Sequence, residues 1–262
     1  MGKLAFNITG PNSLGWRIGN QMFQYASIFG IAKKTGMTPC FNISNTYLGD
    51  CFKLGGVSDE IVTDLHGNIN DLHMVFNDKY FRLKKELNVN VNGYLQTPHY
   101  FDHCRNEIKE EFTFKKHIMK KACDELPTDV LVSVHVRRGD YLKVKEYHTN
   151  LQVEYYKKAM EHFKGYSALI FSDDIEWCKE NLSDLAETVY YSENPPDDGD
   201  DGVYVDLCKM SLCNGHIIAN SSYSWWGAYL GEGTTVAPRK WFGPKGPQKF
   251  DDIFLQEWVL ND

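Results

Sequence analysis

The chain has 262 residues, which suits one large domain or two small ones, and 42% of them are hydrophobic, enough for a packed core without covalent cross-links. Its formal net charge of −7 speaks against general nucleic-acid binding, although a few clustered arginines still allow an anionic ligand to bind. The seven cysteines include no C-x-x-C pair, so neither a disulfide framework nor a zinc site is indicated, and free buried thiols in a reducing compartment are expected.

The first half of the chain opens like a βα unit. A short apolar strand is predicted over residues 4–8, followed by a loop rich in glycine, proline, asparagine and serine that runs through Gly19. Apolar residues then recur at helical spacing over residues 20–34, and Gly36 suits the C-terminal cap of that helix.

The second half repeats this alternation several times. The β-branched run at 130–136 is typical of a strand that is buried on both faces. Further strands are predicted at 168–171, 188–191, 217–219 and 235–237, with helices around Tyr155–Phe163, Trp177–Leu182, Val205–Cys213 and Ser224–Leu230. Strands that alternate with helices indicate an α/β fold with a parallel sheet covered on both faces. Ligands of such sheets bind at the carboxyl ends of the strands.

The segment HVRRGD follows the first of these strands. Arginine is rarely buried without a partner, and its planar guanidinium suits phosphate oxygens, so Arg137 and Arg138 indicate an anion site. Adjacent residues at a strand end point in different directions, so one arginine is expected to reach the ligand while the other pairs with Asp140. The alternative is a surface cluster of salt bridges.

Two further turns carry polar residues at strand ends. Asp174 follows the strand at 168–171, where a carboxylate can accept both donors on one edge of guanine, although capping of the next helix is the more frequent role there. Ser221, Ser222 and Tyr223 follow the strand at 217–219 and open a helix, whose N-terminus favours phosphate.

Two segments give weaker signals. Gly19 and Asn20 stand in a two-glycine loop that lacks the Gly-Lys-Ser/Thr of a phosphate-binding P-loop. Asp197, Asp198, Asp200 and Asp201 provide oxygen ligands, but the stretch ENPPDDGDDG is interpreted as an exposed loop rather than a metal site. No metal is therefore expected.

Together these segments resemble glycosyltransferase family 11, the α-1,2-fucosyltransferases. The similarity lies in GWRIGNQMFQYA at 15–26, GYLQTPHYF at 93–101, HVRRGDY at 135–141 and HIIANSSYSWWGAYL at 216–230, in the family's order. FSDDIEWCKENL at 171–182 also resembles bacterial-type members. Trp16 and Arg17 replace a smaller pair in the glycine loop, and Tyr223 stands where phenylalanine is usual.

The resemblance implies a GT-B architecture, with two Rossmann-like domains and the active site in a cleft between them. We expect an acceptor-side domain over 1–126 and a GDP-sugar-binding domain over 127–262, whose C-terminal segment can pack back on the first domain. The donor implied is GDP-fucose, and the acceptor is a galactoside-containing glycan. Transfer to the 2-hydroxyl of galactose would invert the anomeric carbon without a metal or other cofactor.

The resemblance also assigns roles to residues. Arg137 would hold the β-phosphate with His135 and Arg138 in support, and Asp174 would hold guanine. Ser221, Ser222 and Tyr223 would line the phosphates, while Gly19 and Asn20 would face the cleft. For the acceptor proton, Asp140 and His135 are the candidate bases, and the departing phosphate is the alternative.

Two other functions remain open from the sequence. One is a different GDP-sugar transferase such as a protein O-fucosyltransferase, and the other is a sugar-nucleotide or glycan-binding protein without catalysis. No run approaches the ~18 apolar residues of a membrane span. We therefore expect a soluble, cytoplasmic protein unless an N-terminal anchor has been removed.

Overall fold

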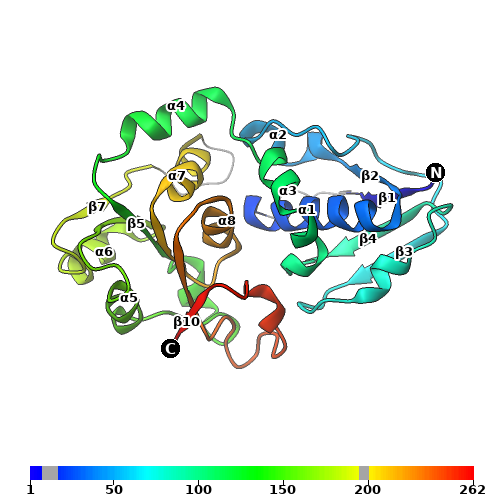
Figure 1. Cartoon of the computed structure of the whole chain (residues 1–262). Coiled ribbons are helices and arrows are strands. Elements are labelled where there is room, and N and C mark those ends of the chain that lie inside the picture. Colours follow the sequence, from blue (N-terminus) through cyan, green and yellow to red (C-terminus); the bar gives the residue numbers. More distant parts are fainter. Residues whose placement is uncertain (8–16, 195–200) are drawn as a thin grey trace. The chain divides into compact units, whose positions relative to one another are not determined.

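The computed structural model describes residues 1–7, 17–194 and 201–262 of the chain shown in Figure 1. The chain divides into two compact units. The first comprises Met1–Lys115 with Lys249–Leu255, and the second comprises Lys116–Gln248 with Gln256–Asp262. A short segment near the C-terminus, η7 (Asp251–Ile253), therefore belongs to the first unit, where it contacts η4 (Pro98–Tyr100).

The first unit is built on a four-stranded parallel sheet of order β2-β1-β4-β3. Its strands are β1 (Lys3–Phe6), β2 (Thr38–Phe41), β3 (Gly67–Asp71) and β4 (Val89–Gly93). The other elements are α1 (Ile18–Thr35), α2 (Leu48–Cys51), α3 (Arg105–Glu111), η2 (Ile43–Asn45), η3 (Asp78–Arg82) and η5 (Asp102–Cys104).

Helix α1 confirms the predicted helix and its cap. Gly36 takes the left-handed conformation with φ of 74°, and its N–H donates to the Ala32 carbonyl at 2.8 Å. The helix is buried along most of its length, and its buried Ser27 donates to the backbone carbonyl of Leu95 at 3.1 Å. Gln24 is fully buried and donates to the Gly93 carbonyl at 3.1 Å.

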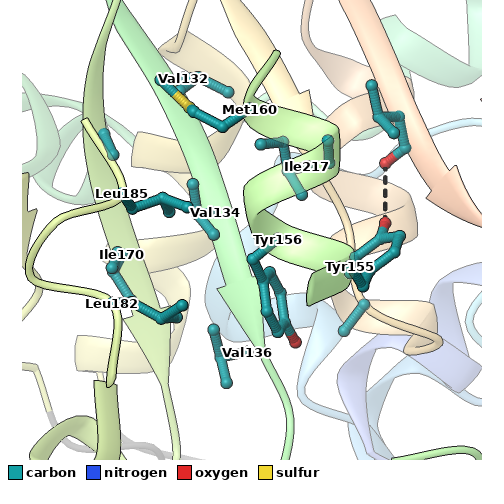
Figure 2. Close-up of a cluster of buried hydrophobic side chains, with 14 of the residues drawn as sticks. Val132, Val134, Val136, Tyr155, Tyr156, Met160, Ile170, Leu182, Leu185 and Ile217 are labelled. Atoms are coloured by element: carbon teal, nitrogen blue, oxygen red, sulfur yellow. Dashed lines mark hydrogen bonds between the residues drawn. The ribbon is translucent and has the colours of Figure 1, made fainter. Parts of the chain in front are cut away.

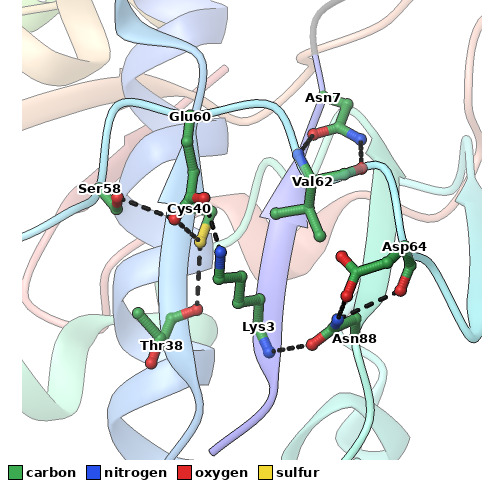
Figure 3. A network of polar contacts seen from close by, with 9 residues as sticks. All are labelled: Lys3, Asn7, Thr38, Cys40, Ser58, Glu60, Val62, Asp64 and Asn88. Atoms are coloured by element: carbon green, nitrogen blue, oxygen red, sulfur yellow. Dashed lines mark hydrogen bonds and ion pairs between the residues drawn. The ribbon is translucent and has the colours of Figure 1, made fainter.

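Polar contacts fasten the segment after β2 over the sheet, as Figure 3 shows. Lys3 Nζ lies 2.6 Å from Glu60, and Asn7 Nδ2 donates to the Val62 carbonyl at 2.8 Å. Val62 itself packs against Ala5 and Cys40. These contacts join the segment that contains Glu60 and Val62 to the chain at both ends of β1.

The second unit carries a six-stranded parallel sheet of order β10-β9-β8-β5-β6-β7. Its strands are β5 (Leu131–Val136), β6 (Ser167–Ser172), β7 (Val189–Tyr191), β8 (Gly215–Ile217), β9 (Thr234–Pro238) and β10 (Val259–Asn261). Its helices are α4 (Lys116–Glu125), α5 (Val153–Met160), α6 (Ile175–Asn181), α7 (Asp201–Leu212), α8 (Ser222–Leu230) and the short η6 (Asp140–Lys143).

Helices cover both faces of this sheet, because side chains alternate along β5. Val132, Val134 and Val136 pack on one face against residues of α5 and α6, the cluster drawn in Figure 2. Leu131 packs on the other face with residues of α7. All residues of β5 are buried, which confirms the prediction from the β-branched run.

The alternation of strands and helices in the second half is confirmed, with one shift in position. Strand β8 spans Gly215–Ile217, whereas 217–219 was predicted. Strands β2, β3, β4 and β10 were not predicted. Helix α4 packs on α7, where Lys209 Nζ lies 2.5 Å from Glu125 of α4, so the compact second unit begins at Lys116. The functional division after residue 126 stays a prediction.

Candidate active site

Three polar turns meet at one edge of the second sheet. Strand β5 lies between β8 and β6 and pairs with both in parallel register. The turns at 137–140, 173–174 and 220–222 therefore leave adjacent strands at their carboxyl ends, where parallel sheets bind ligands. Each turn was predicted at the end of a strand, and the strand order shows that the three strands are neighbours.

Arg137 is held by contacts from several directions. Its Nη1 lies 3.1 Å from Asp173 Oδ2, and its Nη2 lies 2.8 Å from Asp140 Oδ1. The ring of Tyr141 lies 5.5 Å from the guanidinium carbon, within range of a cation–π interaction. The arginine side chain is only 12% exposed, so these contacts hold its guanidinium group in position before any ligand binds.

Arg138 points to a different set of partners. Its Nε lies 3.0 Å from Asp174 Oδ2, and its guanidinium stacks over Trp177 at 3.9 Å from the ring centroid. The expectation that the second arginine pairs with Asp140 is wrong, because Asp140 pairs with Arg137 instead. The expectation that adjacent side chains at the strand end point in different directions is confirmed, since Arg137 and Arg138 contact different aspartates.

Asp174 occupies the N-cap of α6. Its Oδ1 accepts from the Trp177 backbone N–H at 3.4 Å, while its own N–H donates to Ser172 Oγ at 2.9 Å. The side chain is a third exposed. It therefore serves both as a helix cap and as the partner of Arg138, and its predicted contact with guanine stays a prediction.

No separate role was predicted for Asp173, which lies in the site beside both arginines. Its Oδ1 accepts from the Arg138 backbone N–H at 2.8 Å, and its Oδ2 bonds to Arg137. A Cβ atom at Gly139 would lie 2.6 Å from Asp173 Oδ2, so glycine is needed for this close approach. The only sequence signal was the Asp-Asp pair itself, in which either residue could cap the helix.

His135 lies on the face of β5 that α7 and α8 cover. Its ring is 5.6 Å from that of Tyr223, and its side chain is buried. Nδ1 has no hydrogen-bond partner among the described residues. Burial, together with the nearby charge of Arg137, lowers the pKa of His135 to about 3, so its imidazole is neutral near pH 7.

The third turn carries the N-terminus of α8. Ser221 occupies the N-cap position without a capping bond from its hydroxyl, and Ser222 is the first helical residue. Tyr223 donates from its hydroxyl to the Val203 carbonyl at 2.5 Å. Asn220, which had no assigned role, fixes the turn by donating to the carbonyls of Thr149 at 3.0 Å and Trp241 at 2.7 Å.

Gly19 and Asn20 lie in the first unit, in the first turn of α1. Asn20 Oδ1 accepts from Gln96 Nε2 at 2.6 Å, which joins the motif at 15–26 to the one at 93–101. Gly15 and Trp16 lie outside the described residues, as do Asp197, Asp198 and Asp200. Within the described ranges, no group of three or more histidine, cysteine, aspartate or glutamate residues is placed to hold a metal ion.

The family model for glycosyl transferase family 11 matches residues 5–262, which is nearly the whole chain. The chain belongs to glycosyl transferase family 11.

Two curated relatives place it further within the family. A galactoside alpha-(1,2)-fucosyltransferase 1 of Bos taurus is 29% identical over 268 residues, covering 93% of this chain and 73% of the relative. An alpha-1,2-colitosyltransferase of Escherichia coli is 34% identical over 182 residues, covering 64% and 60% respectively.

A solved structure shares the fold of this family 11 chain. The crystal structure of NodZ alpha-1,6-fucosyltransferase soaked with GDP-fucose matches with a TM-score of 0.56 at 13% identity, covering 88% of this chain and 92% of that one. In the parts of the chain that the structure describes, none of the helices has the length and apolar character to cross a membrane.

Proposed function

We propose that this protein transfers L-fucose from GDP-β-L-fucose to the 2-hydroxyl of a terminal galactoside, with inversion and without a metal. The observation that carries the proposal is Arg137, fixed at the carboxyl edge of the sheet beside the N-terminus of α8. The name of the Bos taurus relative, which matches across 93% of this chain, supports the α-1,2 linkage.

Arg137 and the start of α8 account for the electrostatics of such a transfer. Negative charge grows on the diphosphate as its bond to the sugar breaks, and fixed positive groups that face that charge lower the barrier. Arg137 supplies a full charge, while the backbone N–H groups near Ser221 and Ser222 supply the partial charge of a helix N-terminus. These groups would do the work that a metal ion does in other transferases.

The remaining residues have supporting roles in the proposal. Asp174, whose side chain is a third exposed, would accept from guanine, and Arg138 would orient it. Tyr223 would line the phosphates from α8. In the GT-B arrangement that we propose, the first unit binds the acceptor, with Asn20 and Gly19 facing the reacting sugars.

The test is an acceptor screen with GDP-fucose, read by mass spectrometry and linkage analysis of the product. We expect fucose on the 2-hydroxyl of galactose, and unchanged turnover in EDTA. Arg137→Ala should abolish transfer and weaken GDP binding. Arg239→Ala, which removes an exposed arginine paired with Asp262, is the matched control and should keep both. A different linkage, or turnover lost in EDTA, contradicts the proposal.

One observation favours a second donor sugar. The relative with 34% identity is named a colitosyltransferase, and its name shares the α-1,2 linkage but not the sugar. Calorimetry with GDP-fucose and with other GDP-sugars would separate the two donors. Tight binding and transfer only with a sugar other than fucose would assign the second function.

A further inference from the structure

The two acidic partners of Arg137 differ sharply in exposure. Asp173 is 11% exposed and Asp140 is 54% exposed, although both form ion pairs with the same guanidinium. They also bind different nitrogens, Nη1 for Asp173 and Nη2 for Asp140. One side of the arginine is thus anchored inside the turn, and the other side faces a carboxylate in contact with solvent.

The ion pair between Asp173 and Arg137 is expected to remain when the donor binds. Both oxygens of Asp173 are used, one by the Arg138 backbone N–H and the other by Arg137. Gly139 makes room for this carboxylate, because a Cβ atom there would lie 2.6 Å from Asp173 Oδ2. Asp140 has no such enclosure, since it begins the short η6 segment and its side chain is more than half exposed.

We propose that the donor diphosphate replaces Asp140 on Nη2 of Arg137, and that the released Asp140 carboxylate then accepts the proton of the acceptor hydroxyl. This inference rests on the proposed function and names the general base within it. Before the donor binds, Arg137 neutralises Asp140, so the base is held inactive. After the exchange, Arg137 faces the phosphate while Asp173 keeps it in place.

The bonds, electrons and proton of the transfer balance in this step. The bond from the anomeric carbon of the sugar to the β-phosphate oxygen breaks, and its electron pair stays on GDP beside Arg137. The acceptor oxygen forms the new bond to that carbon, and its proton passes to Asp140. His135 does not serve as this base, because it is enclosed in the sheet and burial and Arg137 lower its pKa to about 3.

The test compares GDP binding by calorimetry in the full-length parent, in the isosteric variants Asp140→Asn and Asp173→Asn, and in Asp140→Ala. Asp140→Asn removes the competing charge, so GDP should bind about two- to fivefold more tightly, the scale of one exposed ion pair. Asp173→Asn removes the anchor and should weaken GDP binding roughly tenfold or more. In Asp140→Asn, kcat for transfer should fall by about 10²–10⁴, the usual contribution of a general base.

The sign of the change in GDP affinity decides the proposal. If Asp140 only orients Arg137, Asp140→Asn and Asp140→Ala both weaken GDP binding, and the exchange is overturned. Tighter binding with unchanged kcat overturns the assignment of the base. Because Asp173→Asn can fail to fold, the two Asp140 variants carry the test by themselves. A wrong sugar or linkage in the parent's product would instead overturn the proposed function, without changing these GDP affinities.

Discussion

At the scale of residues, the site pairs opposite charges in a chain whose formal net charge is −7. Two guanidinium groups, Arg137 and Arg138, lie among the carboxylates of Asp140, Asp173 and Asp174. An exposed ion pair contributes about 0–1 kcal/mol, whereas a charge-assisted hydrogen bond contributes about 1.5–3 kcal/mol. A diphosphate can therefore displace the carboxylate of Asp140, while the less exposed carboxylates of Asp173 and Asp174 keep the arginines in position.

His135 gives a prediction about stability against pH. Its folded pKa of about 3 lies below the ordinary histidine value of 6.5, so the unfolded chain binds the proton more readily. The free energy of unfolding should therefore fall as pH falls from about 6.5 to 3, by up to about 1.4 kcal/mol per pH unit from this group. Urea titrations across that range should show a shallower slope in His135→Gln. Parallel curves for the parent and the variant would contradict the burial of a neutral His135.

At the scale of elements, a buried lysine ties helix α7 to helix α4. Lys209 has a side chain only 6% exposed and contacts Glu125 of α4 at 2.5 Å, with Asp206 at 3.6 Å. Asp206 in turn accepts from Ser192 Oγ at 2.6 Å and from Asn194 Nδ2 at 2.7 Å. Through Ser192 and Asn194, the network attaches the residues that follow β7 to helix α7. Helix α7 covers the face of the sheet on which His135 lies.

Removing the lysine charge should loosen this connection. Lys209→Met leaves two carboxylates without their cation, and breaking a buried pair is costly. Since Glu125 is partly exposed, we expect a loss of about 3 kcal/mol in the free energy of unfolding, at the lower end of the range for buried pairs. Lys179→Met, which breaks an exposed pair with Glu176, is the control and should change little. Equal midpoints in urea for the two variants would show that the network adds no stability.

At the scale of the whole molecule, the seven cysteines are free and six of them are buried. Burial raises the pKa of Cys178 to about 11 and of Cys213 to about 12, which keeps these thiols protonated and unreactive. Cys123 on α4 is the exposed one. The reducing compartment expected from the sequence stays a prediction.

Thiol titration tests the pattern directly. With a chromogenic disulfide reagent, one thiol should react rapidly in the native protein and seven should react in denaturant. Cys123→Ser should lose the rapid reaction and keep the six slow thiols. Fewer than seven reactive thiols in denaturant without reductant would reveal a disulfide and contradict a reducing compartment.

The elements that could be predicted are those whose patterns depend on local sequence. The apolar run of β5 and the helical spacing and Gly36 cap of α1 act through neighbouring residues, so they were found. Strands β3 and β4 read GNIND and VNVNG, and glycine and asparagine are depleted in strands, so only pairing within the sheet makes them strands. Buried Gln24 escaped prediction for the same reason, since its partner is the Gly93 carbonyl 69 residues away.

The sequence by itself determined the chemistry of the site: two arginines, an acidic pair and a serine-rich helix start, each after a strand. Because β5 lies between β8 and β6, the three turns that follow these strands lie at the same edge of the sheet. The alternation of strands and helices had indicated such a parallel sheet. Only the tertiary structure decided which carboxylate each arginine holds. It paired Arg137 with Asp140 and Arg138 with Asp174, because side-chain direction and burial at a strand end depend on contacts between segments, which spacing along the chain does not specify.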